Sequence, residues 1–205
     1  MLLWAGTEWG PKNSHLVTSA VDADTTRILT LEQAGYQRTE ELEMTRIFDT
    51  AQFADYPYPT ATLHFQNMAE NLNYDRQAML RRSAWPNHTD DQQTDDAIRA
   101  YIRTSPIYDA RFDFVLVDAA GSHVSGCEAF IDSANNAAEI ERVCTLAECH
   151  DRGYSKMTLR ACLRALHERR IGTAYLSGGY DKTIHLYGAL GHVNEFARYF
   201  YKLDL

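Results

Sequence analysis

Residues 150–155 (HDRGYS) form the pattern in this sequence that most directly indicates chemistry. An apolar-rich stretch runs to about Ala147, a short polar turn centred on Gly153 follows, and apolar residues then recur at helical spacing. A strand, a glycine turn and a helix in this order leave backbone N–H groups of residues 151–156 unpaired at a helix start, where the helix dipole favours an anion. The turn therefore predicts a site for a phosphate-bearing ligand. A plain turn that needs a positive φ angle at its glycine explains the same letters.

Acidic residues precede this turn on the same predicted strand. Glu139 and Glu141 lie two residues apart, so their side chains point to one face of the sheet. They are candidates for accepting a proton, and the alternative is an ordinary solvated strand face. Glu128, on the neighbouring predicted strand, is a further candidate by position alone.

The string ERVCTLAECHDRGYSKMTL resembles the strand, linker and Arg/Gln-x-x-Gly-x-Gly/Ala turn of the GCN5-related N-acetyltransferases. In that family the turn wraps the diphosphate of acetyl-coenzyme A (acetyl-CoA). Two positions depart from the signature: His150 stands where Arg or Gln is usual, and Ser155 stands where Gly or Ala is usual. The cofactor-binding residues that the resemblance implies in this turn are His150, Asp151, Arg152, Gly153, Tyr154, Ser155 and Lys156.

The resemblance also implies roles outside the turn. The stretch IHLYGALGH is similar to the family's closing pattern, in which a tyrosine protonates the departing coenzyme thiolate; here that tyrosine is Tyr187. A buried aromatic residue on an amphipathic helix is the alternative. The backbone of Val143, Cys144 and Thr145 corresponds to the strand segment that pairs with the pantetheine arm. In members similar to mycothiol synthase a glutamate on this strand is the base, which favours Glu141 and then Glu139.

The composition is that of an ordinary globular protein. The chain has 205 residues, of which 45% are hydrophobic and 23% charged, with a formal net charge of −8. A negative net charge argues against general binding to nucleic acid or to an anionic membrane, and it suits a cationic substrate. Four cysteines without paired spacing favour reduced thiols in the cytoplasm. The histidines and cysteines show no zinc-site spacing, and His123 and His185 have no identifiable partner.

The order of predicted elements defines the expected fold. Residues 60–205 are expected to contain a strand, two helices, three antiparallel strands, and then a helix, a strand, a helix and a strand. The first two helices are expected from about Ala69 to Ala84 and, with a cap within 91–94, through about Arg103. The strands of this part are expected at about 60–66, 112–117, 124–132, 138–146, 173–177 and 195–202, and those before it at 15–21 and 39–48. This order matches the acyl-CoA N-acyltransferase fold of the family, an α+β (three-layer α/β/α) fold with a mixed, mostly antiparallel sheet flanked by helices. Residues 1–50 are predicted to form a partial half-domain of strand, helix and strand, and residues 51–59 a linker. Within 1–50, a helix end with Trp4 and Trp9 is expected over residues 1–10.

The sequence therefore predicts a tandem-domain acetyltransferase with a truncated first domain. It would move an acetyl group from acetyl-CoA to a primary amine of a small-molecule acceptor by direct attack, without a metal. No nucleic acid or membrane partner is expected, and a homodimer stays open. The alternative is a non-catalytic acyl-CoA-binding or regulatory module, which the unusual residues His150, Ser155 and Tyr180 favour.

Overall fold

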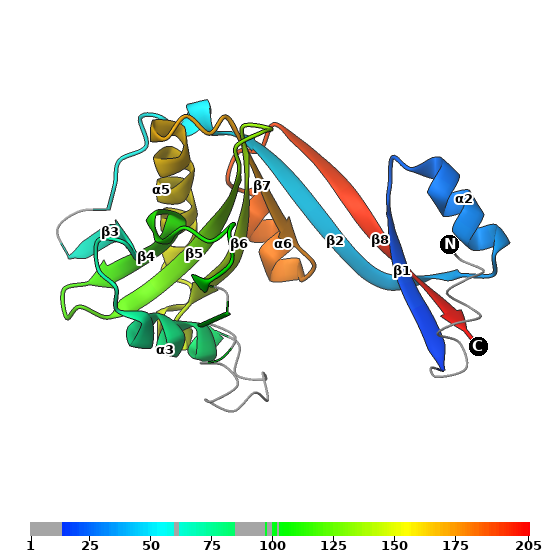
Figure 1. Cartoon of the computed structure of the whole chain (residues 1–205), viewed down its shortest axis with the longest axis horizontal. Helices are drawn as coiled ribbons and strands as arrows, with labels where there is room; N and C mark the ends of the chain where they lie inside the picture. Colours follow the sequence, from blue (N-terminus) through cyan, green and yellow to red (C-terminus); the bar gives the residue numbers. More distant parts are fainter. Residues whose placement is uncertain (1–13, 60–61, 85–96, 98–99, 102) are drawn as a thin grey trace. The chain divides into compact units, whose positions relative to one another are not determined.

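Eight strands and four α-helices have defined bounds in the described part of this computed structural model, which comprises residues 14–59, 62–84, 97, 100–101 and 103–205 (Figure 1). The chain divides into two compact units. Residues 1–47 and 177–205 make up unit 1, and residues 48–176 make up unit 2. Each unit is described by itself.

Unit 1 combines strands from both ends of the chain. Its elements are β1 (His15–Val21), α2 (Thr25–Gln33), β2 (Gln37–Asp49), α6 (Asp181–Gly188) and β8 (Asn194–Asp204), although the last two residues of β2 belong to unit 2. β8 lies between β1 and β2 and pairs with both in the antiparallel sense. The Asp24 carboxylate caps α2 by accepting from the Arg27 N–H at 3.0 Å. Leu31 of α2 packs with Tyr36 and Tyr201 in the core of this unit.

Unit 2 contains a five-stranded sheet with the order β7-β6-β5-β4-β3. The strands are β3 (Leu63–Asn67), β4 (Asp113–Asp118), β5 (His123–Asp132), β6 (Ala137–Thr145) and β7 (Thr173–Gly178), of which the last two residues belong to unit 1. β6 and β7 are parallel, and the other neighbours are antiparallel. The helices are α3 (Tyr74–Ala84) and α5 (Tyr154–Glu168), with 3-10 turns η2 (Thr50–Phe53), η3 (Ala110–Phe112) and η4 (Ala147–Cys149).

The two faces of this sheet are covered by different helices. Val115 and Val117 of β4 cluster with Tyr74 of α3, whereas Leu116 between them clusters with Tyr154 and Met157 of α5. Because successive side chains of a strand point to opposite faces, α3 and α5 lie on opposite sides of the sheet. The face toward α3 is called the α3 face below.

The expected α+β fold class, with a mixed and mostly antiparallel sheet flanked by helices, is confirmed. The expected strands agree with the observed ones within a few residues, but α3 begins at Tyr74 rather than near Ala69. The helix end expected over 1–10 lies outside the described residues. Most of the helix expected to reach Arg103 from a cap within 91–94 also lies outside them, and its described residues 97, 100, 101 and 103 are helical.

The compact units differ from the domain boundaries that the sequence suggested. α6 and β8 belong with residues 1–47, because β8 pairs with β1 and β2. The division into a half-domain of residues 1–50, a linker of residues 51–59 and a domain of residues 60–205 stays a prediction.

The packing of α3 can be tested with two adjacent residues. Leu80 is 1% exposed and Met79 is 62% exposed. Leu80→Ala is expected to lower the free energy of unfolding of unit 2 by about 2–5 kcal/mol, because it removes buried methyl groups and leaves a cavity. Met79→Ala should change it by less than about 0.5 kcal/mol. Urea unfolding followed by circular dichroism measures both, and equal losses would show that α3 does not pack as described.

Candidate functional site

The turn before α5 has the backbone geometry of an anion site. Asp151 and Gly153 both have positive φ angles, of 60° and 77°, and Gly153 is the N-cap of α5. No side chain caps this helix start, so the first N–H groups of α5 are left for another acceptor. A Cβ atom added at Gly153 would meet no atom within 4 Å. The space in front of the helix start is therefore open.

The two unusual residues of the turn both bind Thr145 at the end of β6. The ring nitrogen Nε2 of His150 lies 3.1 Å from the Thr145 carbonyl oxygen, which can only accept, so the imidazole donates. The Ser155 hydroxyl lies 2.7 Å from the Thr145 hydroxyl, which is 3.0 Å from the Ser125 hydroxyl of β5. His150 and Ser155 thus fasten the turn to the sheet.

β6 separates from β7 just before this turn. The two strands pair only from Ala137 and Thr173 to Ile140 and Leu176, while β6 continues to Thr145. Over the rest of its length β6 pairs with β5 alone. Gly126 pairs with Cys144 and Glu128 pairs with Glu141, so β6 has one more residue than β5 between these two pairs. This extra residue makes a β-bulge, in which Arg142 has a φ angle of 52°. Within unit 2, the edge of β6 at Val143, Cys144 and Thr145 that faces away from β5 therefore has no strand partner.

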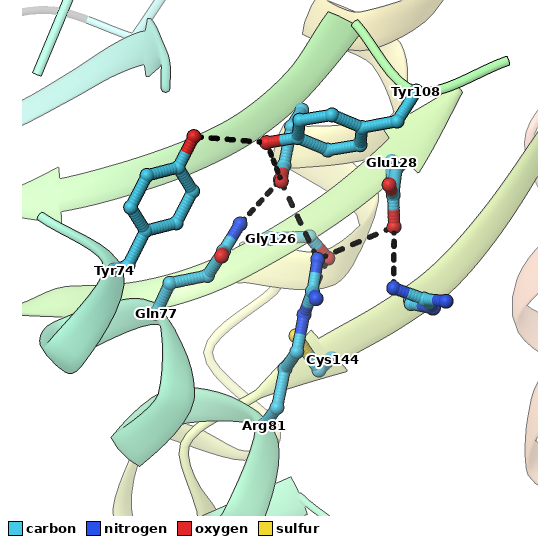
Figure 2. A network of polar contacts seen from close by, with 9 residues as sticks. Tyr74, Gln77, Arg81, Tyr108, Gly126, Glu128 and Cys144 are labelled. Carbon is cyan, nitrogen blue, oxygen red and sulfur yellow. Dashed lines mark hydrogen bonds and ion pairs between the residues drawn. The ribbon is translucent and has the colours of Figure 1, made fainter. Parts of the chain in front are cut away.

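The α3 face beside this edge holds buried charges (Figure 2). Glu128 of β5 is 1% exposed, and its Oε2 atom lies 3.4 Å from a guanidinium nitrogen of Arg81 and 3.0 Å from one of Arg142. Arg81 also lies 3.5 Å from the Asp113 carboxylate. Burial, and then the negative charge of Asp113, raise the pKa of Glu128 above its ordinary value.

Asp113 joins this cluster to α3 and to the connector before β4. Gln77 donates to its Oδ1 atom at 2.5 Å, and the Tyr108 hydroxyl donates to its Oδ2 atom at 3.1 Å. The hydroxyl of Tyr74 lies 3.3 Å from that of Tyr108. Burial raises the pKa of Asp113, and burial together with the charge of Asp113 raises the pKa of Tyr108. Both oxygens of the Asp113 carboxylate therefore have hydrogen-bond donors.

Arg81, Asp113 and Tyr108 are not among the candidate residues that the sequence pattern indicated. One signal was available, namely an aspartate at the start of the otherwise apolar stretch DFVLV. A buried acidic residue needs a partner, but the identity of that partner follows from the packing of α3 and not from sequence spacing.

The two candidate bases lie on the α3 face with Glu128. Glu141 is the cross-strand partner of Glu128, and Glu139 is the partner of Phe130. Directly paired residues of antiparallel strands share a face. Glu141 is partly buried and Glu139 is exposed. Which of the two acts as the base stays a prediction.

Tyr187 belongs to unit 1. It is a buried residue of α6. A Cβ atom at Gly178 would lie 2.9 Å from the Tyr187 ring and 2.6 Å from the Thr183 hydroxyl. Only glycine at position 178 therefore allows α6 to pack this closely against the end of β7. The N-cap of α6 is Tyr180, whose backbone N–H lies 3.2 Å from the Thr183 hydroxyl.

The remaining candidates of the sequence carry no site. His123 is buried, neither of its ring nitrogens has a hydrogen-bond partner among the described residues, and burial lowers its pKa to about 4. His185 is exposed.

In the part of the chain that the structure describes, no three His, Cys, Asp or Glu side chains gather in a way that could hold a metal ion. None of the described helices has the length and apolar character needed to cross a membrane.

Comparison with known proteins places this geometry in a known fold. No protein-family model and no curated protein matches the sequence. Among solved structures, the tandem GCN5-related N-acetyltransferase of the clavulanic acid biosynthesis pathway matches 99% of this chain with a TM-score of 0.74 at 14% identity. The GCN5-related N-acetyltransferases of Sphaerobacter thermophilus and Kribbella flavida each match 99% of this chain at 14% identity, with TM-scores of 0.70 and 0.69.

The chain covers 69%, 66% and 73% of the length of these three proteins, in that order. The chain has the fold of the GCN5-related N-acetyltransferases. The subtype similar to mycothiol synthase stays a prediction.

The neutral state of His123 gives a pH prediction. Its folded pKa of about 4 lies below the ordinary value of about 6.5, so between these values the unfolded chain binds a proton that the folded chain excludes. The contribution of this histidine to stability is complete above pH 6.5 and is lost as the pH falls toward 4. His123→Leu should flatten the fall in unfolding free energy over this window. His64→Leu, at an exposed position of β3, is the control and should keep the wild-type slope. An unchanged slope in His123→Leu would contradict the assignment.

Proposed function

We propose that this chain, which has the fold of the GCN5-related N-acetyltransferases, transfers an acetyl group from acetyl-CoA to a primary amine of a small-molecule acceptor. The observation that carries the proposal is the unpaired edge of β6 at residues 143–145, which runs directly into a turn with an uncapped helix start. These two features, in this order, suit an extended thiol arm that ends in a diphosphate. The fold supports acyl transfer, and the acetyl donor and the amine acceptor are our inference.

The residues present fit acetyl-CoA as a substrate. The backbone N–H groups of residues 152–156 would donate to the diphosphate, and the open space at Gly153 leaves room for it. The backbone of Val143, Cys144 and Thr145 would pair with the pantetheine arm as an added strand does. The His150 ring donates to the carbonyl of Thr145, so we assign His150 to holding the turn rather than to the diphosphate.

The reaction needs a proton acceptor and a proton donor. An ammonium group must lose a proton before its nitrogen can attack the thioester carbonyl, and we assign this proton to Glu141 or, second, to Glu139. The new C–N bond forms as the C–S bond breaks. The thiolate that leaves takes a proton from the Tyr187 hydroxyl in our assignment, which gives the acetylated amine and coenzyme A.

One observation favours a second function. Position 150 holds a histidine whose ring is engaged with the Thr145 carbonyl, so the turn has no arginine at this position to meet the diphosphate, and its cationic side chains are Arg152 and Lys156. A chain with such a turn could bind acyl-CoA without turnover, as a regulatory module.

The cofactor site is tested by two glycine variants. Gly153 and Gly191 both have positive φ angles, of 77° and 97°, and neither has an atom within 4 Å of an added Cβ. Gly153→Trp is expected to abolish saturable binding of acetyl-CoA in calorimetric titration, because the indole fills the space before α5. Gly191→Trp imposes a similar backbone strain at a position outside residues 150–156, in unit 1, and should bind as the unchanged protein does. Equal affinity in both variants would refute a cofactor site at this turn.

The catalytic assignment is tested by conservative substitutions. Tyr187→Phe and Glu141→Gln should each reduce turnover roughly 100-fold or more, the usual contribution of a positioned acid or base, while acetyl-CoA binding survives. Release of coenzyme A during a screen of amines, followed with a thiol reagent, measures this. Full turnover in Tyr187→Phe would remove the assigned acid. Binding of acetyl-CoA without turnover of any amine would instead support the regulatory module.

A further inference from the structure

Glu128 has one carboxylate oxygen without a partner. Its Oε2 atom forms ion pairs with Arg81 and Arg142. Its Oε1 atom is buried and has no hydrogen-bond partner among the described residues. Asp113, in the same cluster, has donors on both of its oxygens. A buried carboxylate oxygen without a donor is costly, so it indicates a missing donor.

Arg142 is the more exposed of the two arginines that pair with Glu128. Its side chain is 28% exposed, against 1% for Glu128 and 15% for Arg81. It projects from the β-bulge of β6 with a φ angle of 52°, and its guanidinium lies 6.0 Å from the centre of the Phe130 ring. A partly exposed arginine on a fully buried carboxylate is a counter-ion that another cation can replace.

The charges of the described α3 face favour a cation. Arg76 of α3 adds one positive charge to this face, at the Gly121 carbonyl. Four carboxylates face this side from β4, β5 and β6, and two guanidinium groups form ion pairs among them. The carboxylates are Asp113, Glu128, Glu139 and Glu141, and the guanidinium groups belong to Arg81 and Arg142. This excess of negative charge attracts a positively charged ligand and repels an anionic one.

We propose that Glu128 anchors a cationic amine ligand, whose ammonium group displaces Arg142 from Glu128 and donates a hydrogen bond to Oε1. The cross-strand partner of Glu128 is Glu141, and the next pair along the strands is Gly126 with Cys144. A cation held at Glu128 therefore lies beside the candidate base and beside the unpaired edge of β6. Identifying this ligand with the acetyl acceptor rests on the proposed function; the cation site itself does not.

Arg142 and Glu128 have opposite expected effects, which separates a binding role from a structural one. If the pair only stabilises the fold, removing either partner harms the protein in the same direction. If Arg142 competes with the ligand, Arg142→Gln tightens ligand binding and Glu128→Gln abolishes it.

The experiment is calorimetric titration with 1,4-diaminobutane, with the neutral 1,4-butanediol as a matched probe. Arg142→Gln should bind the diamine at least roughly tenfold more tightly than the wild type, as expected when one charged competitor is removed, and neither protein should bind the diol. Adding Glu128→Gln to Arg142→Gln should abolish the gain. Arg111→Gln removes an equal charge from an exposed ion pair with Asp109 and should leave diamine affinity at the wild-type value.

Each outcome decides between a ligand-binding role and a purely structural role of the pair formed by Arg142 and Glu128. Diamine affinity that is unchanged or weaker in Arg142→Gln overturns the proposal that Glu128 binds a cationic amine. An equal gain of affinity in Arg111→Gln also overturns it, because such a gain would reflect the net charge of the protein alone. Unfolding curves check that each variant is folded. If the double variant does not fold, the affinity of Arg142→Gln for the diamine still tests the proposal. A separate titration with acetyl-CoA tests the proposed function. Diamine binding with the expected pattern but no acetyl-CoA binding would keep the cation site and remove the acetyltransferase.

Discussion

The site depends on one constraint, that β6 stays paired with β5 after it has left β7. The parallel ladder between β6 and β7 ends at Ile140 and Leu176, and the bulge at Arg142 falls directly afterwards. A non-glycine residue with a positive φ angle is disfavoured by roughly 1–2 kcal/mol, so the ladder with β5 must hold it in place. The departure of β6 frees backbone groups at residues 143–145 and brings the chain to the turn before α5. The proposed phosphate site at the turn and the proposed extended site along the strand are therefore two consequences of one backbone feature.

Buried charge on the α3 face follows from the same strand pairing. Glu128 and Asp113 are cross-strand partners, and such a pair of like charges is unfavourable in a buried place unless a cation lies between them. Arg81 of α3 supplies that cation, at 3.4 and 3.5 Å. This contact fixes α3 against the sheet, and the second oxygen of Glu128 has no donor among the described residues. The polar cluster thus orders the fold and also provides the proposed cation site.

Local features of the sequence were enough to predict the strands and the turn at Gly153, because strand alternation and glycine turns are short-range signals. The fold class followed from the order of these elements together with the resemblance to the GCN5-related N-acetyltransferases. Arg142 gave no such signal, since bulges at non-glycine residues depend on strand register. The pairing of Arg81 with Asp113 and Glu128 depends on how α3 lies on the sheet, and residues far apart in the chain decide that. The two compact units were also not foreseen, because the pairing of β8 with β1 joins opposite ends of the chain. The contacts of His150 and Ser155 with Thr145 depend on how the turn lies against the end of β6, which sequence spacing does not reveal.

Amide hydrogen–deuterium exchange with and without acetyl-CoA tests the central claim most directly, because the claim concerns backbone groups. The account predicts that acetyl-CoA slows exchange at residues 143–145 and 152–156, and leaves the amides of β4 unchanged. Binding of acetyl-CoA that protects other segments and leaves both of these ranges unchanged would contradict it.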